Sequence, residues 1–166
     1  MTTHTQPPYQ SFYQGLSMEL SQLFLISWAA LIFWVLGQIW LVQIVIYPLF
    51  AKVGAVDYVH YHRFYSQHIP LPVIIPGFAS FLLPFALALY GPAVPLWMGI
   101  LNIATGMVGL LVTVMLEIPR HARLEKNGKN DATIAELIRY NWPRTVSISA
   151  QSVITFLMLC YVFGDI

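Results

Sequence analysis

The sequence predicts an all-α integral membrane protein, a bundle of four transmembrane helices with two short cytoplasmic helices at the membrane interface. Its composition is the first reason. Of the 166 residues, 58% are hydrophobic and only 9% are charged, whereas ordinary soluble domains carry about 25% charged residues. The second reason is that four stretches can cross a hydrocarbon core about 30 Å thick, at residues 23–47, 70–90, 94–118 and 143–163. We treat residues 1–166 as one transmembrane domain.

Charge and cysteine content exclude several classes of protein and site. The formal net charge is +1, so no basic surface for nucleic acid is expected. The single cysteine, Cys160, excludes an internal disulfide and a cysteine-rich metal site. Residues 1–19 are polar and contain no Lys or Arg. This differs from the basic start of a signal peptide, and we expect a flexible N-terminal arm.

The first span, residues 23–47, carries two amides that are costly in a membrane, Gln38 and Gln43. These side chains either form hydrogen bonds between helices or line a pocket, and the sequence leaves both roles open. Pro48 is expected to end this span, because the residue before a proline disfavours the helical conformation.

Residues 55–69 mix aromatic rings with three histidines, a pattern typical of a short helix at the level of the lipid headgroups. The second span, residues 70–90, holds four prolines, and we expect a kink at Pro84. A tight turn at residues 91–93 then predicts that the second and third spans lie antiparallel and side by side.

The third span, residues 94–118, carries small and polar residues on one helical face. They recur at spacings of three and four: Gly99, Asn102, Gly106, Gly109, Thr113 and Glu117. Small residues at this spacing allow a neighbouring helix to approach closely, and we expect such a contact at Gly106 and Gly109. Glu117 is a functional candidate, because an ionisable residue at the edge of a span is costly.

Residues 119–142 form the longest predicted loop. Within it, Asp131 is placed to cap a second interfacial helix that runs through Tyr140. The fourth span, residues 143–163, begins at Pro143, which fits the first turn of a helix.

All eight Lys and Arg residues lie in two of the loops, residues 48–69 and 119–144. The positive-inside rule places such loops in the cytoplasm. We therefore expect a multi-pass protein of the cell (inner) membrane, with both termini outside the cytoplasm.

The chain's unusual polar residues gather at the predicted cytoplasmic end. They are His60, His62, His68, Glu117, His121, Asn141, Arg144 and Thr145. Three interpretations stay open. In the structural one, Glu117 pairs with Arg144 or Arg63, because buried charges are normally paired. In the metal-site one, His68, His121 and Glu117 hold a non-haem metal or a haem, without a compact motif such as H-E-x-x-H.

The third interpretation is a pocket for an apolar small molecule that enters from the bilayer. His121 and Glu117 would be its catalytic residues, because proton transfer needs groups that titrate near neutral pH. The residues that would bind the substrate or cofactor are His60, His68, Asn141, Arg144 and Thr145. We expect Glu117, His121 and Arg144 to face one pocket, which a histidine from residues 60–68 closes.

A resemblance appears at these residues. The third span ends in Thr113-x5-Pro119-x-His121, and Asn141-Trp142-x-Arg144-Thr145 opens the last span. This arrangement resembles a group of small uncharacterised four-span bacterial integral membrane proteins. More distantly, it is similar to the anthrone-oxygenase-like membrane proteins. The resemblance covers about residues 25–160 and implies the four-span fold and cofactor-independent oxidation of an aromatic polyketide; it implies no particular catalytic residue.

The leading functional prediction is the binding of a hydrophobic small molecule or cofactor at a cytoplasmic-side polar pocket, with redox or oxygenase chemistry as the candidate reaction. The alternative is a non-catalytic accessory subunit of a larger membrane complex. Four aromatic residues predicted to face lipid could contact other membrane subunits or a second copy of the chain: Trp28, Phe33, Trp34 and Trp40. A transporter is disfavoured, because the sequence shows no inverted repeat.

Overall fold

A computed structural model describes residues 8–164 of the chain, with side chains described from Met18 onward. It is 90% helical, and the residues that it describes contain no strand. Within this range, four helical stretches are long and apolar enough to cross a membrane: Met18–Lys52, Pro70–Tyr90, Leu96–Asn127 and Asp131–Phe163. The predicted all-α class is confirmed, and the four apolar stretches indicate a multi-pass membrane protein.

The described chain starts with one long helix. It consists of α1 (Pro8–Leu41), the π-helical segment η1 (Val42–Ile46) and α2 (Tyr47–Lys52). Residues 8–19 are therefore helical, and the prediction of a flexible arm is wrong for them. A proline at the start is compatible with this helix, because the first helical position needs no N–H donor. Residues 1–7 lie outside the described part of the chain.

The third span is extended in the same way. Helix α5 (Leu96–Val112) continues through η3 (Thr113–Glu117) into α6 (Ile118–Asn127). The prediction of a loop over residues 119–127 is wrong, because the helix passes Pro119 without ending.

Pro48 and Pro119 each stand two residues after a π-helical segment. At these points a backbone bond spans five residues, as in the bond from the N–H of Ile118 to the carbonyl oxygen of Thr113. A proline lacks an N–H, and its ring clashes with the carbonyl four residues earlier. The wider π turn beside it therefore keeps the helix continuous, and the prediction that Pro48 ends the first span is wrong.

The second interfacial helix and the fourth span, predicted as separate, are one helix, α7 (Asp131–Phe163), with Pro143 inside it. The two segments share one buried face, because Leu137, Asn141 and Thr145 are all buried at successive turns. A break between them would interrupt this face.

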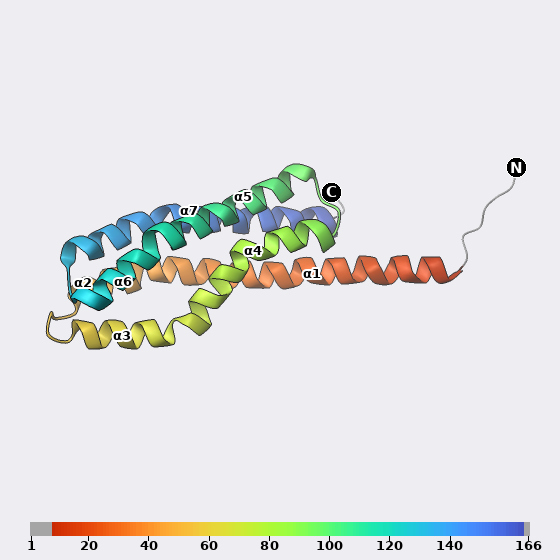
Figure 1. The fold of residues 1–166 in the computed structure, drawn as a ribbon. Coiled ribbons are helices and arrows are strands. Elements are labelled where there is room, and N and C mark those ends of the chain that lie inside the picture. Colours follow the sequence, from red (N-terminus) through yellow and green to blue (C-terminus); the bar gives the residue numbers. More distant parts are fainter. Residues whose placement is uncertain (1–7, 165–166) are drawn as a thin grey trace, which may run out of the picture.

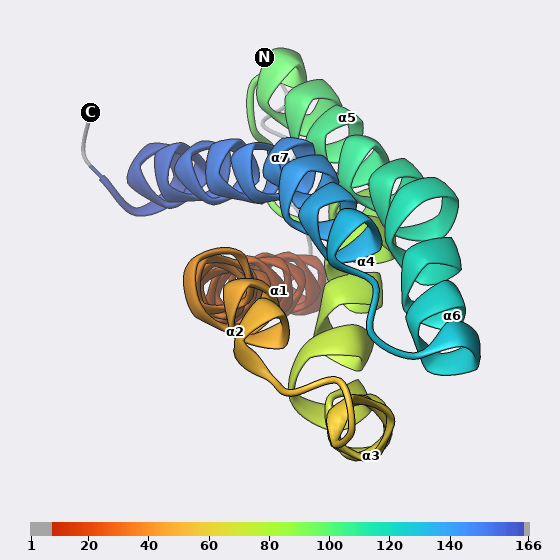
Figure 2. The same cartoon turned by 90° about the vertical axis from the view of Figure 1, so that its left-hand side faces the viewer.

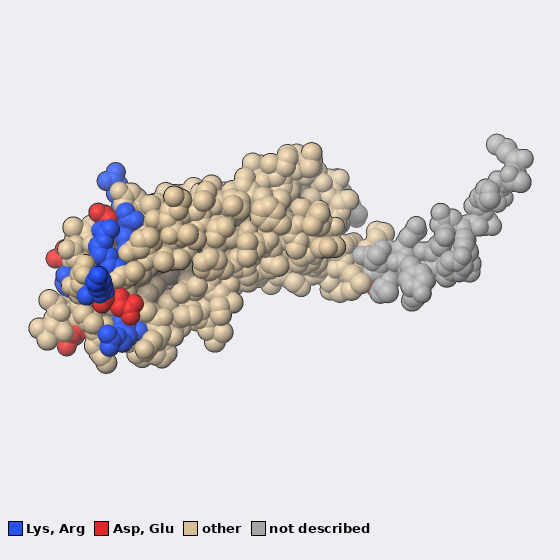
Figure 3. Space-filling view, in the orientation of Figure 1, with Lys and Arg blue, Asp and Glu red and all other residues tan. Residues whose placement is uncertain are grey.

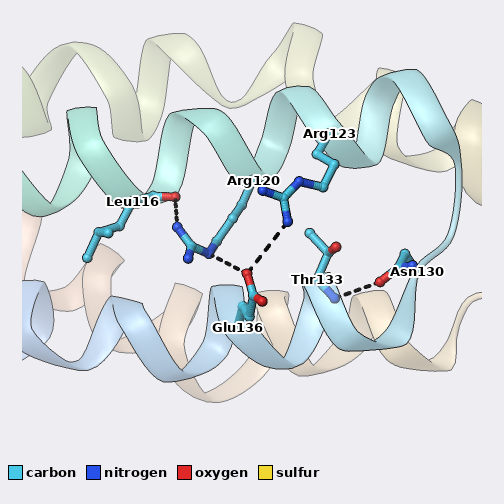
Figure 4. A network of polar contacts seen from close by, with 6 residues as sticks. All are labelled: Leu116, Arg120, Arg123, Asn130, Thr133 and Glu136. Carbon is cyan, nitrogen blue, oxygen red and sulfur yellow. Dashed lines mark hydrogen bonds and ion pairs between the residues drawn. The ribbon is translucent and has the colours of Figure 1, made fainter.

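Helices α6 and α7 are tied together near the turn between them (Figure 4). Arg120 Nε donates to Glu136 Oε2 at 3.1 Å, and a second arginine of α6 lies 3.8 Å from the same oxygen. The Oδ1 atom of Asn130 accepts a hydrogen bond from the N–H of Thr133 at 2.8 Å and caps α7. The prediction of Asp131 as the cap is therefore wrong by one residue.

A short helix, α3 (Tyr58–His68), follows the first span, in the region where the sequence predicts one. The second span then starts with the π-helical segment η2 (Pro70–Ile74) and continues as α4 (Ile75–Tyr90), with Pro84 inside. The apolar helices lie side by side: α7 contacts both α1 and α5, and α4 contacts the same two helices (Figures 1 and 2).

The close helix contact predicted at two glycines is confirmed. A Cβ atom on Gly109 would lie 2.5 Å from Cε1 of Phe81, and one on Gly106 would lie 3.0 Å from Nε2 of Gln151. These glycines therefore let α4 and α7 approach α5 closely. Gly99, by contrast, has no neighbouring atom within 4 Å of its Cβ position.

Trp28 does not face lipid, contrary to the prediction. It is 1% exposed, and its Nε1 donates to Oγ1 of Thr155 at 2.9 Å. The other three aromatic residues of that set, Phe33, Trp34 and Trp40, are exposed. Trp28 instead belongs to the apolar core between α1, α4, α5 and α7.

The two ends of the molecule differ in charge. Helices α2, α3 and α6 and the first turns of α7 gather at one end, and the turn between α4 and α5 lies at the other (Figure 1). The visible Lys and Arg side chains cluster at the first of these ends (Figure 3). Lys129 also ties this end together, because its Nζ donates to the carbonyl oxygens of Ala51 and Val53 at 3.0 and 2.8 Å.

Candidate functional site

A cavity of about 310 Å³ lies at the charged end of the molecule. All three π-helical segments line it: Val42 from η1, Val73 and Ile74 from η2, and Thr113 and Glu117 from η3. Helices α2, α3, α4, α6 and α7 complete the wall. Because π-helical turns occur frequently at functional sites, this convergence marks the cavity as the candidate site.

The polar part of the cavity wall includes the three residues that the sequence predicts to share one pocket. Glu117, His121 and Arg144 all line this cavity. The remaining polar residues of the wall are Tyr47, Tyr65, Ser66, Thr113 and Glu125. The rest of the lining is apolar, so the cavity combines a polar end with an apolar body.

Glu117 is buried and accepts no hydrogen bond of ordinary length, although the hydroxyl of Tyr47 lies near its carboxylate. It is 1% exposed, and neither carboxylate oxygen has a hydrogen-bond partner. Arg144 donates through Nη1 to Oγ1 of Thr113 at 3.3 Å, while its Nε has no partner. The ion pairs of the described residues do not join Glu117 to Arg144 or to Arg63. The predicted ion pair is therefore not formed.

His121 is the centre of a chain of hydrogen bonds beside Glu117. Its Nε2 lies 3.1 Å from the hydroxyl of Tyr47, and its Nδ1 lies 3.1 Å from Nε2 of His62. An N–H···N bond between two imidazoles needs one ring nitrogen that accepts, so at least one of the two histidines is neutral. The chain joins α2, α6 and α3 across the cavity wall.

The inner face of α3 packs on this chain. Phe50 forms edge contacts with the rings of Tyr58, His62 and Tyr65, and Tyr65 stacks on His121 with ring centroids 5.8 Å apart. Burial lowers the pKa of His62 below its ordinary value and raises the pKa of Tyr58 to about 12. The burial of His62 among these rings therefore favours its neutral form.

The histidine of α3 that contacts the cavity residue His121 is His62, which does not itself line the cavity, whereas the sequence analysis assigns ligand binding to His60 and His68. Both of these residues are exposed, and the Nδ1 atom of His68 bonds to the carbonyl oxygen of Phe64 at 2.8 Å. The reason is helical phase: Tyr58, His62 and Tyr65 stand at spacings of four and three and face inward, and His60 and His68 fall on other faces. His60 and His68 are not among the residues that line this cavity.

Asn141 and Thr145 do not line the cavity either. Both are 0% exposed. Asn141 Nδ2 donates to Oε1 of Gln43 at 2.8 Å, and Thr145 Oγ1 lies 3.3 Å from the same oxygen. Gln43 in turn donates to the carbonyl oxygen of Ile138 at 3.1 Å. Asn141 and Thr145 therefore join α7 to the first span, and they are not among the residues that line this cavity.

The predicted metal ligands do not meet. His68 is exposed and bonded to its own helix, away from Glu117 and His121. Among the described residues, no group of three His, Cys, Asp or Glu side chains is arranged to hold a metal ion. Both ring nitrogens of His121 are also engaged by protein groups, so His68, His121 and Glu117 do not form the metal site that the sequence analysis considers.

The cavity residues that are absent from the sequence analysis of the site include Tyr47 and Tyr65. Tyr47 directly precedes Pro48, just as Ile118 precedes Pro119, and both positions follow a π-helical segment. A proline two to three residues after the polar end of a span is the signal that could have identified this wall. No protein-family model, curated protein or solved structure matches the chain.

Proposed function

We propose that this protein binds a hydrophobic small molecule whose polar group enters the cavity beside Glu117, and that Glu117 and His121 transfer protons to and from it. The observation that carries this proposal is the buried Glu117 carboxylate, which lines the cavity and accepts no hydrogen bond of ordinary length, although the hydroxyl of Tyr47 lies near it. An unpartnered carboxylate is costly away from water. A ligand that donates a hydrogen bond to it would remove this cost.

The size and lining of the cavity support a small-molecule ligand. Small-molecule pockets usually measure about 300–1,000 Å³ and combine an apolar lining with a few placed polar groups. The cavity, at about 310 Å³, lies at the lower limit of that range. A metal or haem is not part of the proposal.

Proton transfer is supported by the bonded chain Tyr47–His121–His62. A group that gives or takes a proton must lie within hydrogen-bond reach of its partner. Both ring nitrogens of His121 are engaged by Tyr47 and His62, so His121 would exchange protons with the ligand through the hydroxyl of Tyr47, which lines the cavity. The resemblance to the anthrone-oxygenase-like membrane proteins makes oxidation of an aromatic ligand the reaction that we would test first.

We further propose a four-helix transmembrane bundle in the cell (inner) membrane, with α3 at the interface. The clustering of Lys and Arg at one end supports this orientation (Figure 3), since positive loops remain in the cytoplasm. The cavity then faces the cytoplasmic side, and both termini lie outside the cytoplasm. Lys126→Cys, in a Cys160→Ser background, should resist an impermeant thiol reagent in intact cells; ready labelling would reverse the orientation.

The test of function is the ligand that accompanies the purified protein. Extraction and mass spectrometry should find a hydrophobic small molecule with the wild type, and His121→Ala and Glu117→Gln should lose it while still eluting as folded protein. His60→Ala and His68→Ala are the matched controls, because they remove exposed histidines and should keep the ligand. Equal ligand content in all five proteins would contradict the proposal.

A further inference from the structure

We infer that the ligand is an amphiphile with a hydroxyl-bearing head in the cavity and a hydrocarbon tail in a slot between α1 and α4. This inference rests on the proposed function and specifies its ligand class. It goes beyond the cavity itself, because it assigns a role to a second hollow and to a glycine that no helix contact explains.

The second hollow, of about 60 Å³, adjoins the cavity. The two share five lining residues: Val73, Ile74, Phe78, Thr113 and Arg144. From this junction the slot runs between Val35 and Ile39 of α1 and Gly77 of α4. Most of the residues that line it are apolar, which suits a hydrocarbon chain and no charged group.

Gly77 is the residue that keeps the slot open. No atom lies within 4 Å of the position that its Cβ would take. At Gly106 and Gly109, in contrast, neighbouring atoms lie close to the position that a Cβ atom would take. Gly77 therefore borders empty space, and a side chain at this position would enter the slot without a clash.

The unpartnered polar atoms define the head group. The two carboxylate oxygens of Glu117 need a donor, and the Nε of Arg144, at the junction of cavity and slot, needs an acceptor. A hydroxyl group can serve as both donor and acceptor. A phosphate or carboxylate head would place a second negative charge beside Glu117, and like charges at this distance repel.

The experiment uses two photoreactive probes, ethylphenol and dodecylphenol, each with a diazirine at the end of its alkyl chain. In the full-length protein, ethylphenol should label the cavity wall, and dodecylphenol should label the segment around Val35 and the segment around Gly77. Excess unlabelled dodecylphenol should compete with both. Glu117→Gln should lose the labelling by both probes.

Gly77→Leu should lose the labelling of the slot by dodecylphenol and keep the labelling of the cavity by ethylphenol, which also shows that the variant is folded. The smaller side chain of Gly77→Val occupies less of the same space and should reduce the labelling of the slot only in part. Gly37→Leu is the matched control, because Gly37 also has no neighbour within 4 Å of its Cβ position but does not line the slot.

The outcomes separate the two proposals. Cavity labelling by ethylphenol without competed slot labelling by dodecylphenol would overturn the tail slot and leave the proposed function standing. Slot labelling that survives in Gly77→Leu would also overturn it. Failure of both probes to label the cavity in a Glu117-dependent manner would overturn the proposed function as well.

Discussion

The α5–η3–α6 helix has two contrasting regions. Around Gly106 it is closed: Gln151 Nε2 donates to the carbonyl oxygens of Ser80 and Asn102 at 3.1 Å each, and a Cβ atom on Gly106 would lie only 3.0 Å from that nitrogen. Around Glu117 the same helix forms a π turn and borders a cavity, with a carboxylate that has no partner. The first region holds the helices together, and the second has polar atoms left for a ligand.

The same contrast separates residues three positions apart on α7. Asn141 is fully buried and bonded to Gln43, whereas Arg144 lines the cavity with an unpartnered Nε. Both residue types are costly in a membrane. Each keeps one buried polar atom without a partner, Oδ1 in Asn141 and Nε in Arg144. The position of Arg144 on the cavity wall therefore identifies it as the candidate for ligand binding.

The largest effect is expected in the closed region. Gly109→Leu should destabilise the protein by about 3 kcal/mol or more, because overpacking typically costs about 1–3 kcal/mol and Phe81 lies only 2.5 Å from the new Cβ. Thermal unfolding in detergent measures this. Gly99→Leu, which adds the same side chain where there is open space, should be close to wild type. Equal stability of the two variants would remove the distinction between closed and open regions.

At the cavity, a substitution is expected to change stability in the opposite direction. Glu117→Gln should stabilise the protein by about 1–2 kcal/mol, because a neutral amide is less costly to bury than a carboxylate without a partner, while ligand is lost. Arg144→Gln should add independently to this change. The control is Glu125→Gln, which removes an exposed carboxylate of the same cavity. A destabilised Glu117→Gln with non-additive coupling to Arg144→Gln would show that the two charges pair after all.

The sequence was sufficient for the helical class, the four apolar stretches and the close contact at Gly106 and Gly109, because composition and small-residue spacing encode them locally. It was also sufficient to predict that Glu117, His121 and Arg144 line one pocket. It failed for helix ends: the prolines at 48, 119 and 143 suggested boundaries, yet Pro48 and Pro119 follow π turns and Pro143 lies inside one helix.

The sequence also failed for the identity of the pocket histidine, for a physical reason. His60, His62 and His68 have the same chemistry, and only the rotation of α3 about its axis decides which one faces His121. That rotation is set by the packing of Tyr58 and Tyr65 on Phe50, a contact with another helix. Likewise, no local sequence pattern indicates that the side chain of Asn141 donates its hydrogen bond to Gln43.

The smallest effect concerns the pH dependence at the cavity end. Burial lowers the pKa of His62 below its ordinary value of 6.5, so the unfolded chain takes up a proton at higher pH than the folded protein does. Stability is therefore full above the unfolded pKa and falls as the pH drops below it. Glu125 opposes this shift but is outweighed by burial, and the other titratable groups that face His62 are Tyr58, Tyr65 and His121.

We expect the midpoint of thermal unfolding to decrease between about pH 7 and about pH 5, and His62→Gln to weaken this dependence because glutamine does not titrate. His60→Gln is the control for the loss of any imidazole, because it removes an exposed histidine from the same helix. A slope that is identical in wild type and His62→Gln would mean that His62 takes up its proton at the same pH in the folded and unfolded chains. The Tyr47–His121–His62 chain would then not depend on a neutral His62, and the contrast between the closed helix contact at Gly106 and a proton-sensitive cavity would rest on Glu117 alone.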